Sequence, residues 1–364
     1  MAGDQHDDQD DDQDDDQGEH RRRRVTLTQV AQRAGVSVMT ASYTYSRPER
    51  VSPEARARVH DAATELDYAG PDPRARSLRR GSTLTLGVVM GERLGYAFED
   101  PGAVAFLAGV ADVCADRGYG MTILPVSGDL GDGSRVSEAA VDGFIVWTTT
   151  DDDPVLMAVA ATRRPMVVHG GPTVTGAHLV SIDNHAASHA AGAVAFAGAR
   201  RPAVVSQPLT RDRASGIERG VAPSRASFPV TRDRLAGYAD ALAEAGFAWD
   251  DVPVAVCARN NVEEAQRLAA ELLGAAEPPD AVAAMSDQQA IGVLRAARAA
   301  GLEVPGDLSL TGFDDVPAAA DLGLTTVAQS LRDQGEACAR AAFGEEPADF
   351  AAAWSVVTRA SARP

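Results

Sequence analysis

Two histidines lie four residues apart in a stretch with helical periodicity. His185 and His189 would share one face of a helix, a spacing that can hold a divalent metal ion. A metal site needs further ligands, and no third ligand is evident near this pair. We therefore interpret the two side chains as solvated or packed, and we expect no metal site.

Clusters of carboxylates are the other groups that could do chemistry. Asp151, Asp152 and Asp153 follow one apolar run, and Asp314 and Asp315 follow another, positions suited to helix caps and to the surface. The chain contains no GxxxxGK[ST] loop, no GxSxG motif and no GxGxxG after a strand. The sequence therefore predicts no catalytic residues and no cofactor, and we do not expect an enzyme.

Charge is distributed unevenly along the chain. The net charge is −18, and every one of the 34 basic residues is Arg. Residues 1–20 carry nine Asp and one Glu with no Arg, whereas residues 21–80 carry thirteen Arg against six acids. A small basic module thus lies between an acidic tail and an acidic remainder. Local charge decides phosphate binding, so this module can bind nucleic acid although the whole chain is acidic.

The residues after the basic run predict three short helices. The first spans Leu27 to Ala34 with Thr26 as its cap, and Gly35 ends it. Ser37 caps the second helix, Val38 to Tyr45, and a third begins at Pro53 and ends near Leu66. An abrupt stop and restart of this kind is typical of a helix-turn-helix, whose second helix presents one face to the major groove of DNA.

From Thr83 onward, apolar runs alternate with helical stretches. We expect strands within 83–90, 120–126, 142–147, 164–170, 201–207, 280–286 and 307–313. We expect helices near 102–117, 153–163, 184–198, 232–246, 262–274, 287–300 and 330–343. Such alternation predicts parallel sheets with helices on both faces, and the length favours two Rossmann-like subdomains with a ligand cleft between them.

These patterns divide the chain into four parts. They are a disordered acidic tail and basic run (1–24), a helix-turn-helix domain (25–68), a Pro- and Arg-rich hinge (69–82) and a bilobed α/β domain (83–364). We expect the first lobe to take residues 83–182 and 329–346, and the second lobe 183–328 and 347–364. Three distant cysteines, no signal peptide and no membrane span favour a soluble cytoplasmic protein.

The order of motifs resembles the lactose-repressor (LacI) family of bacterial transcription regulators. The resemblance runs from about Val25 to the end and rests on "VTLTQVAQRAGVS", "RVSPEARARVHDAATELDY", "ARSLR", "VDGFIV", "DRLAGYADAL", "MSDQQAIGVLRAARAAGLEVPGDLSLTGFDD" and "LTTVAQ". It implies an all-α helix-turn-helix domain joined to a bilobed domain like the periplasmic binding proteins. It also implies a homodimer that binds a palindromic operator in double-stranded DNA, at the nucleoid, and is switched by a small molecule such as a carbohydrate.

The resemblance implies which residues read DNA. Base edges would be contacted by Val38, Met39 and Tyr43. Phosphates would be contacted by small hydroxyls, namely Thr26, Ser37, Thr40 and Ser42. The family usually has "TVSRVLN" where this chain has "TASYTYS", so Tyr43 replaces an Arg that commonly reads guanine. Tyr cannot form the two-pronged contact of Arg with guanine, and Val38 and Met39 prefer thymine methyl groups, so an unusual half-site is expected. Alternatively, Tyr43 packs on the domain core, as we expect of Tyr45.

The resemblance also implies a role for the hinge. Leu78 matches the leucine that wedges into the minor groove at the operator centre, and Arg76 and Arg79 would lie beside phosphates or in the groove. A solvated linker is the alternative. The hinge is one residue longer than its commonest form.

Six residues match or suit an effector site. Asp287 and Arg234 match family positions that hydrogen-bond ligand hydroxyls, and Gln329 matches a position at the crossover between lobes. Asp183 is either a pocket residue or a helix cap. Phe98 and Trp147 could stack on a sugar ring or belong to the core. The stretch 207–230 is irregular, contains four Arg, and could lie at the mouth of the cleft.

The leading hypothesis is therefore a DNA-binding regulator, with a repressor expected. The alternative is a cytoplasmic small-molecule-binding protein, or a sugar-processing enzyme, with no specific role on DNA. No leucine heptad follows residue 343, which favours a dimer over a tetramer.

Overall fold

The computed structural model describes residues 25–71, 80–126, 131–345 and 354–364. The chain forms two compact units, Met1–Gly81 and Ser82–Pro364.

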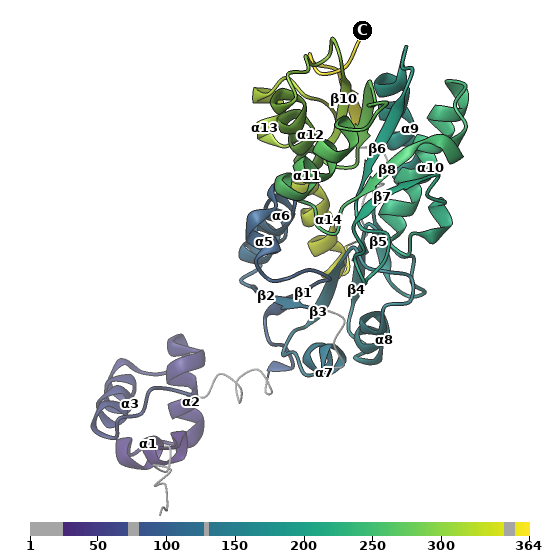
Figure 1. Cartoon of the computed structure of the whole chain (residues 1–364). Helices are drawn as coiled ribbons and strands as arrows, with labels where there is room; N and C mark the ends of the chain where they lie inside the picture. The colour runs from purple at the N-terminus through teal and green to yellow at the C-terminus, as the bar shows by residue number, and fades with distance from the viewer. Residues whose placement is uncertain (1–24, 72–79, 127–130, 346–353) are drawn as a thin grey trace, which may run out of the picture. The chain divides into compact units, whose positions relative to one another are not determined.

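The first unit is a bundle of short helices (Figure 1). Their bounds are α1 (Leu27–Ala34), α2 (Val38–Ser46), the 3-10 helix η1 (Pro48–Arg50) and α3 (Pro53–Glu65). The predicted caps Thr26 and Ser37 are confirmed, and Ser52 caps α3 in the same way, because each side chain accepts a hydrogen bond from the backbone N–H three residues ahead. Gly35 has a φ of 66°, a left-handed conformation that costs glycine little, so α1 ends there and α2 begins three residues later.

Small residues hold these helices close together. Val30 and Ala31 of α1, Ala41 of α2, and Val59 and Ala62 of α3 are buried against one another. Alanines at the crossings let the backbones approach, and a core of this size leaves the outer face of α2 uncovered.

The second unit is built on two sheets. The first sheet has the order β2-β1-β3-β4-β5, and its paired strands are parallel. Its strands are β1 (Thr85–Met90), β2 (Gly120–Pro125), β3 (Gly143–Trp147), β4 (Met166–His169) and β5 (His178–Val180). One face is covered by α5 (Tyr96–Glu99), α6 (Pro101–Asp116) and α14 (Leu331–Ala342), and the other by α7 (Asp132–Ser137) and α8 (Pro154–Ala161).

The second sheet has the order β12-β11-β10-β9-β6-β8-β7. Its strands are β6 (Pro202–Ser206), β7 (Gly216–Arg219), β8 (Pro253–Val256), β9 (Ala281–Ala284), β10 (Ser309–Asp314), β11 (Thr325–Gln329) and β12 (Trp354–Val357). The edge strands β7 and β12 are antiparallel to their neighbours, and the inner pairs are parallel.

Helices cover both faces of the second sheet (Figure 1). The helices α9 (Asn184–Phe196) and α10 (Pro229–Glu244) lie on one face. The helices α11 (Val262–Leu273) and α12 (Asp287–Ala299) lie on the other. Shorter helices lie at the periphery, namely η2 (Pro223–Arg225), η3 (Trp249–Asp251) and α13 (Pro317–Asp321).

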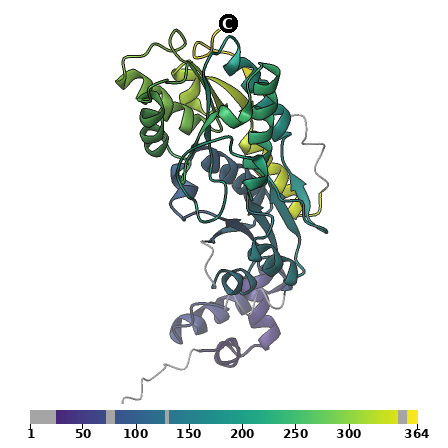
Figure 2. The same ribbon diagram turned by 45° about the vertical axis from the view of Figure 1, so that its right-hand side comes forward.

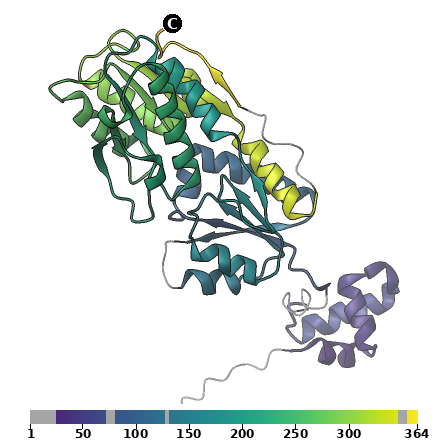
Figure 3. The ribbon, with the colours of Figure 1, turned by 90° about the vertical axis from the view of Figure 1, so that its right-hand side faces the viewer.

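The chain passes between the two lobes more than once. It crosses after β5, again after β11, and again between α14 and β12. As a result α14, near the C-terminus, packs beside α6 of the first lobe (Figures 2 and 3). Residues at the crossings therefore lie between the two sheets.

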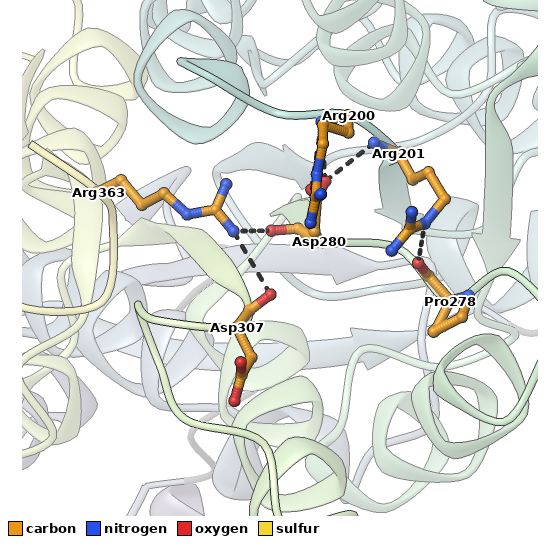
Figure 4. A network of polar contacts seen from close by, with 6 residues as sticks. All are labelled: Arg200, Arg201, Pro278, Asp280, Asp307 and Arg363. Carbon is orange, nitrogen blue, oxygen red and sulfur yellow. Dashed lines mark hydrogen bonds and ion pairs between the residues drawn. The ribbon is translucent and has the colours of Figure 1, made fainter.

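Hydrogen bonds to two aspartates hold together segments of the second unit that are distant in sequence. Asp280, which precedes β9, accepts from the backbone N–H groups of Arg200 and Arg201 at 3.0 and 2.9 Å. The guanidinium of Arg200 also donates to Asp280, at 3.1 Å, and that of Arg363 donates to its backbone carbonyl at 2.8 Å (Figure 4). Asp142 likewise accepts from Ser82, Thr83 and Leu84, the first residues of this unit.

The predicted fold class is confirmed, and each predicted helix and strand overlaps an observed one. The strands β5, β7, β8, β11 and β12 were not predicted. The stretch 207–230 was expected to be irregular, but Gly216–Arg219 forms an edge strand paired with β8. This strand is short and carries charged residues, so its sequence lacks the apolar run that marks an inner strand.

Candidate functional site

The outer face of α2 in the first unit carries exposed apolar side chains. Val38 is 46% exposed and Met39 is 64% exposed, while Ala41 and Thr44 on the opposite face are buried. Large apolar side chains seldom lie free at adjacent positions of a short helix unless they contact something outside the chain. These two side chains are therefore accessible to a molecule outside the chain.

Three of the small hydroxyls, those of Thr26, Ser37 and Thr40, lie at the start of α1 or α2, whereas Ser42 lies in the middle of α2. Thr26 and Ser37 are exposed caps, and Ser37 Oγ is 2.8 Å from Thr40 Oγ1. Thr40 and Ser42 are half-buried. Backbone N–H groups at a helix start favour an anion, so these positions suit phosphate contacts.

The two tyrosines of α2 differ in their surroundings. Tyr45 packs edge-on against His60 and Tyr68, with ring centroids 5.7 and 6.3 Å away, and burial raises the pKa of its hydroxyl. The prediction that Tyr45 packs on the core is thus confirmed. Tyr43 is half-buried and lies one turn after Met39, on the side of the helix that faces outward. Arg76, Leu78 and Arg79 lie outside the described residues.

A cavity of about 100 Å³ lies between the two lobes of the second unit. The first lobe contributes Glu92, Tyr96, Trp147, Thr148, His169, Gly170, Leu331 and Gln334. The second lobe contributes Asn184, Gln207, Arg213, Phe228, Val230, Thr231, Arg234 and Asn260. Trp147, His169 and Gln329 are the last residues of their strands, so the cavity lies at the carboxyl ends of the strands, where such folds bind ligands.

Three rings pack together on the first-lobe side. Trp147 and His169 are opposed across β3 and β4, and their rings stack with centroids 4.7 Å apart. Phe106 of α6 packs against both, 4.4 Å from Trp147 and 4.7 Å from His169. Trp147 therefore belongs to the core, as one of the two alternatives held, and it also lines the cavity.

Arg234 supplies a buried cation on the second-lobe side. It is 4% exposed, its Nε donates to Asn184 Oδ1 at 2.9 Å, and its guanidinium lies 3.5 Å from the ring centre of Phe313. A further N–H donates to the carbonyl of Met285. Burial lowers its pKa, but a guanidinium remains charged at neutral pH. The side chain is thus fixed in place with its charge facing the cavity region.

A chain of polar side chains runs from the first lobe to the second. His169 Nε2 lies 2.9 Å from Gln334 Oε1, and Gln334 Nε2 donates to Gln329 Oε1 at 3.0 Å. Gln329 Nε2 then donates to Asp314 Oδ1 at 2.8 Å. Burial raises the pKa of Asp314 to about 8, although the charge of Arg234 opposes this. Gln329 therefore lines the cavity, as predicted, and also links the two lobes.

Three predicted effector residues do not line this cavity. Phe98 on α5 is 68% exposed and turns outward. Asp183 is exposed and caps α9, its Oδ1 accepting from Ala186 N at 2.9 Å. Asp287 is fully buried, where it accepts from Thr326 Oγ1 at 2.6 Å and from Val316 N at 2.9 Å. Burial raises its pKa to about 7, and its two oxygens join the start of α12 to β11 and to the backbone of Val316.

Sequence reasoning missed several residues of the cavity. His169, Gln334 and Asn260 line it but were not predicted, whereas Asn184, which opens α9 beside Asp183, was a candidate for the pocket edge and does line it. His169 had a detectable signal, because it follows the apolar run "MVV" as Trp147 follows "FIV", and the carboxyl ends of the strands face the cleft. Gln334 had no such signal, because it lies on α14, which is distant in sequence from the strands of the first lobe.

The histidine pair on α9 contacts α10. His185 Nε2 lies 2.9 Å from Asp240 Oδ2, and His189 Nε2 lies 3.1 Å from Glu244 Oε2. Within the described ranges, no group of three or more His, Cys, Asp or Glu could hold a metal ion. Among those same residues, no helix has the length and apolar character needed to cross a membrane.

Comparison with known proteins finds matches to both units. Residues 26–70 match the model of the bacterial regulatory proteins of the lacI family, and residues 195–353 match a periplasmic binding protein-like domain. An HTH-type transcriptional regulator of Mycobacterium tuberculosis is 39% identical over 86% of this chain and 89% of its own length.

Solved structures show the same architecture. A LacI-family regulator from Corynebacterium glutamicum is 31% identical, with a TM-score of 0.69 over 93% of this chain and 98% of its own. The regulator CelR in complex with cellobiose is 26% identical, with a TM-score of 0.64 over 93% of this chain and 100% of its own. The relatives are regulators, so the alternative of a binding protein or enzyme with no role on DNA is set aside. The chain belongs to the lacI family of bacterial transcriptional regulators.

Proposed function

We propose that this regulator represses transcription as a cytoplasmic homodimer that binds a palindromic operator and is switched by a neutral polyhydroxyl molecule. The observation that carries the proposal is the chemistry of the cavity between the lobes. Amides and hydroxyls of Asn184, Gln207, Thr231, Asn260 and Gln329 line it together with an aromatic wall.

This lining suits a sugar better than an ion. Hydroxyls of a sugar both donate and accept hydrogen bonds, and amide side chains offer both functions. Glu92 and Arg213 pair with each other at 2.6 Å, so Arg234 is the one charged residue of the described lining that has no ion-pair partner. The Trp147 ring offers an apolar face, and Arg234 offers fixed donors. The likeness to CelR, whose structure contains cellobiose, supports a carbohydrate.

The ligand would act by favouring one arrangement of the lobes. Cavity residues come from both lobes, so a bound molecule contacts both and favours the arrangement in which its contacts are complete. By linkage, that preference changes the affinity for DNA at the other unit.

The outer face of α2 supports an operator that differs in sequence from the operators of typical relatives. Val38 and Met39 present apolar side chains to bases, and Tyr43 would stand where the family commonly has Arg. Thymine methyl groups are the complementary feature in the major groove. We also propose the hydroxyls of Thr26, Ser37, Thr40 and Ser42 as phosphate contacts, and Arg76, Leu78 and Arg79 as contacts to the operator centre.

The test is selection of bound sequences from random DNA with the full-length protein and with Tyr43→Arg. The expected result is a palindrome for both proteins, with half-site bases that change in the variant toward guanine. An identical palindrome for both would remove Tyr43 from the base contacts. The absence of any enriched palindrome, with and without neutral sugars, would contradict the proposed function.

A further inference from the structure

The charge of the chain changes sign just before the helix-turn-helix. Residues 1–20 carry nine Asp and one Glu with no Arg, whereas residues 21–48 carry six Arg with no Asp or Glu. The nine Asp lie within residues 4–16, which we call the Asp-rich segment. This segment lies outside the described residues, and the match to the lacI family begins only at residue 26. Two blocks of opposite charge, one of them outside the family match, are thus adjacent in the sequence.

The described part of the first unit leaves its DNA-contacting side without negative charge. The helices α1 and α2 contain no carboxylate, so no acidic residue lies in their first turns, where free backbone N–H groups favour an anion. The five acids of the described first unit all lie from Glu49 to Asp67, in η1, in α3 and just after it. Arg47, at the end of α2, is exposed and has no ion pair among the described residues. The outer face of α2 can therefore attract an anionic chain without opposition from its own carboxylates.

The Asp-rich segment is close enough to reach this face. Eight residues separate Asp16 from Val25, and this length of chain spans up to about 30 Å when extended. A folded unit of this size is roughly 25 Å across. Because the segment is tethered, its effective concentration at the face is on the order of millimolar. The acidic remainder of the chain repels the segment, which makes the first unit its favourable partner.

We propose that the Asp-rich segment binds the outer face of α2 and the adjacent run Arg21–Arg24 when DNA is absent, so that DNA must displace it. Contacts to phosphates supply the sequence-independent part of DNA affinity, and a chain of carboxylates competes for the same cations and helix ends. Any DNA that covers this face displaces the segment, so operator and non-specific DNA are weakened by a similar factor. The segment thus sets the absolute affinity for DNA and leaves the sequence preference unchanged. This inference rests on the proposed function, because it concerns the same DNA-contacting face.

Methyl NMR of the full-length protein tests the contact. A spin label on Gln9→Cys lies within the segment and leaves its charge unchanged, and the three native cysteines are buried. The methyl group of Met39, which is 64% exposed on α2, reports on docking. The methyl group of Met157, which is 78% exposed on α8 of the second unit, is the matched control. We expect the label to broaden the signal of Met39 but not that of Met157, and we expect added duplex DNA to restore the signal of Met39.

Removal of the charge tests the competition. Asp→Asn at all nine positions of the segment keeps its length, so any change is due to charge. The broadening of Met39 should disappear in this variant. Fluorescence anisotropy should show about tenfold tighter binding to duplex DNA of random sequence at about 50 mM salt. The variant should select the same bases from random DNA as the wild type does.

Two sets of four substitutions separate the position of the charge from its amount. The first set lies in the segment and consists of Asp11→Asn, Asp12→Asn, Asp14→Asn and Asp15→Asn. The second set removes exposed acids of the second unit and consists of Asp250→Asn, Glu271→Gln, Glu277→Gln and Glu303→Gln. Both change the net charge equally, and only the first should strengthen DNA binding.

Three results would overturn the inference. Equal gains in DNA affinity from the two sets would show an effect of net charge alone. Tighter DNA binding without broadening of Met39 in the wild type would mean that the segment repels DNA from a distance. An unchanged DNA affinity after all nine substitutions would mean that the segment serves only solubility.

The inference and the proposed function can fail separately. If no palindrome is selected from random DNA, but Met39 is broadened and the charge-free variant binds random duplex more tightly, the proposed operator fails while the inference stands. If a palindrome is selected and Met39 is not broadened, the inference fails while the regulator stands.

Discussion

Arg213 and Glu92 form an ion pair across the cleft, with Arg213 Nη2 2.6 Å from Glu92 Oε1. Arg213 comes from the Arg-containing stretch 207–230 of the second lobe, and Glu92 follows β1 of the first. The same Nη2 donates to the carbonyl of Gly91 at 3.0 Å, and Nη1 donates to that of Ala258 at 3.2 Å. One guanidinium therefore holds both lobes at the edge of the cavity. Asn260 makes a second bridge of this kind, donating to Asp100 Oδ2 at 3.0 Å.

Loss of this bridge should weaken the closed arrangement of the lobes. Arg213→Gln leaves the half-buried Glu92 without its cation, and burial already raises the pKa of that carboxyl. We expect about a three- to tenfold loss of affinity for a sugar bound in the cavity, measured by calorimetry, because part of the binding energy must then restore closure. Arg225→Gln is the matched control, since Arg225 pairs with Glu218 of its own lobe on the surface. Equal effects of the two substitutions would rule out a specific role for the bridge.

Asp142 should govern how ligand binding reaches the DNA-binding unit. It accepts from Thr83 N at 2.7 Å and from Leu84 N at 2.9 Å, and Leu84 has a φ of 53°, which a non-glycine residue seldom adopts. The carboxylate thus fixes the backbone where the second unit begins. Asp142→Ala should leave sugar affinity within about twofold of wild type while reducing the response of DNA binding to sugar severalfold. Calorimetry and fluorescence anisotropy on the same preparations measure the two quantities, and an unchanged DNA response would contradict this role.

Asp280 should stabilise the second lobe through its charge. Burial alone would raise its pKa, but the backbone N–H groups of Arg201 and Arg200 and the guanidinium of Arg200 lower it overall. Asp280→Asn is expected to lower the free energy of unfolding by about 2 kcal/mol at pH 7. Because the pKa of the folded state lies below that of the unfolded state, this stabilisation is present above pH 3.8 and is lost as pH falls below it. Measured by urea unfolding, the difference in free energy of unfolding between wild type and Asp280→Asn should become smaller in acid. A constant difference would mean that the substitution disturbs packing and does not remove a charge interaction.

His169 should make the protein less stable in mild acid. Its pKa falls from 6.5 to about 4 on folding, so between these values the unfolded chain takes up a proton that the folded chain does not. The contribution of His169 to the free energy of unfolding is complete above pH 6.5 and declines as pH falls toward 4, by about 3 kcal/mol at most. Comparison of wild type with His169→Gln by urea unfolding across this range measures it. The wild type should lose more stability on acidification, and parallel curves would show that His169 is not neutral and buried as described.

Local signals in the sequence were sufficient for the helices of the first unit. Ser37 caps α2 because its side chain bonds the next turn, and Gly35 ends α1 because it tolerates a positive φ. Both effects act within a few residues of chain, so the boundaries could be predicted closely. Edge strands such as β7 and β12 depend on a distant partner and carry no such signal.

The cavity could be predicted only in part. Trp147, Arg234 and Gln329 were expected there and do line it. Phe98 was expected there too, but sequence alone does not show which face of α5 meets the sheet. Asp287 was expected there as well, but it is not among the lining residues, and its carboxylate accepts hydrogen bonds from Thr326 and Val316 that only the folded chain brings together. Gln334 and His169 likewise meet through packing of α14 against β4, across 165 residues of chain.

The central claim is that a neutral molecule in the cavity controls DNA binding. The most direct measurement is fluorescence anisotropy of full-length protein on its selected operator, with and without a saturating neutral sugar shown by calorimetry to bind. The account predicts a change in operator affinity of about 5- to 150-fold, the usual range of coupling between two sites. Arg213→Gln should show a smaller change, and Arg225→Gln should behave like wild type. An operator affinity that does not change when the cavity is fully occupied would contradict the account.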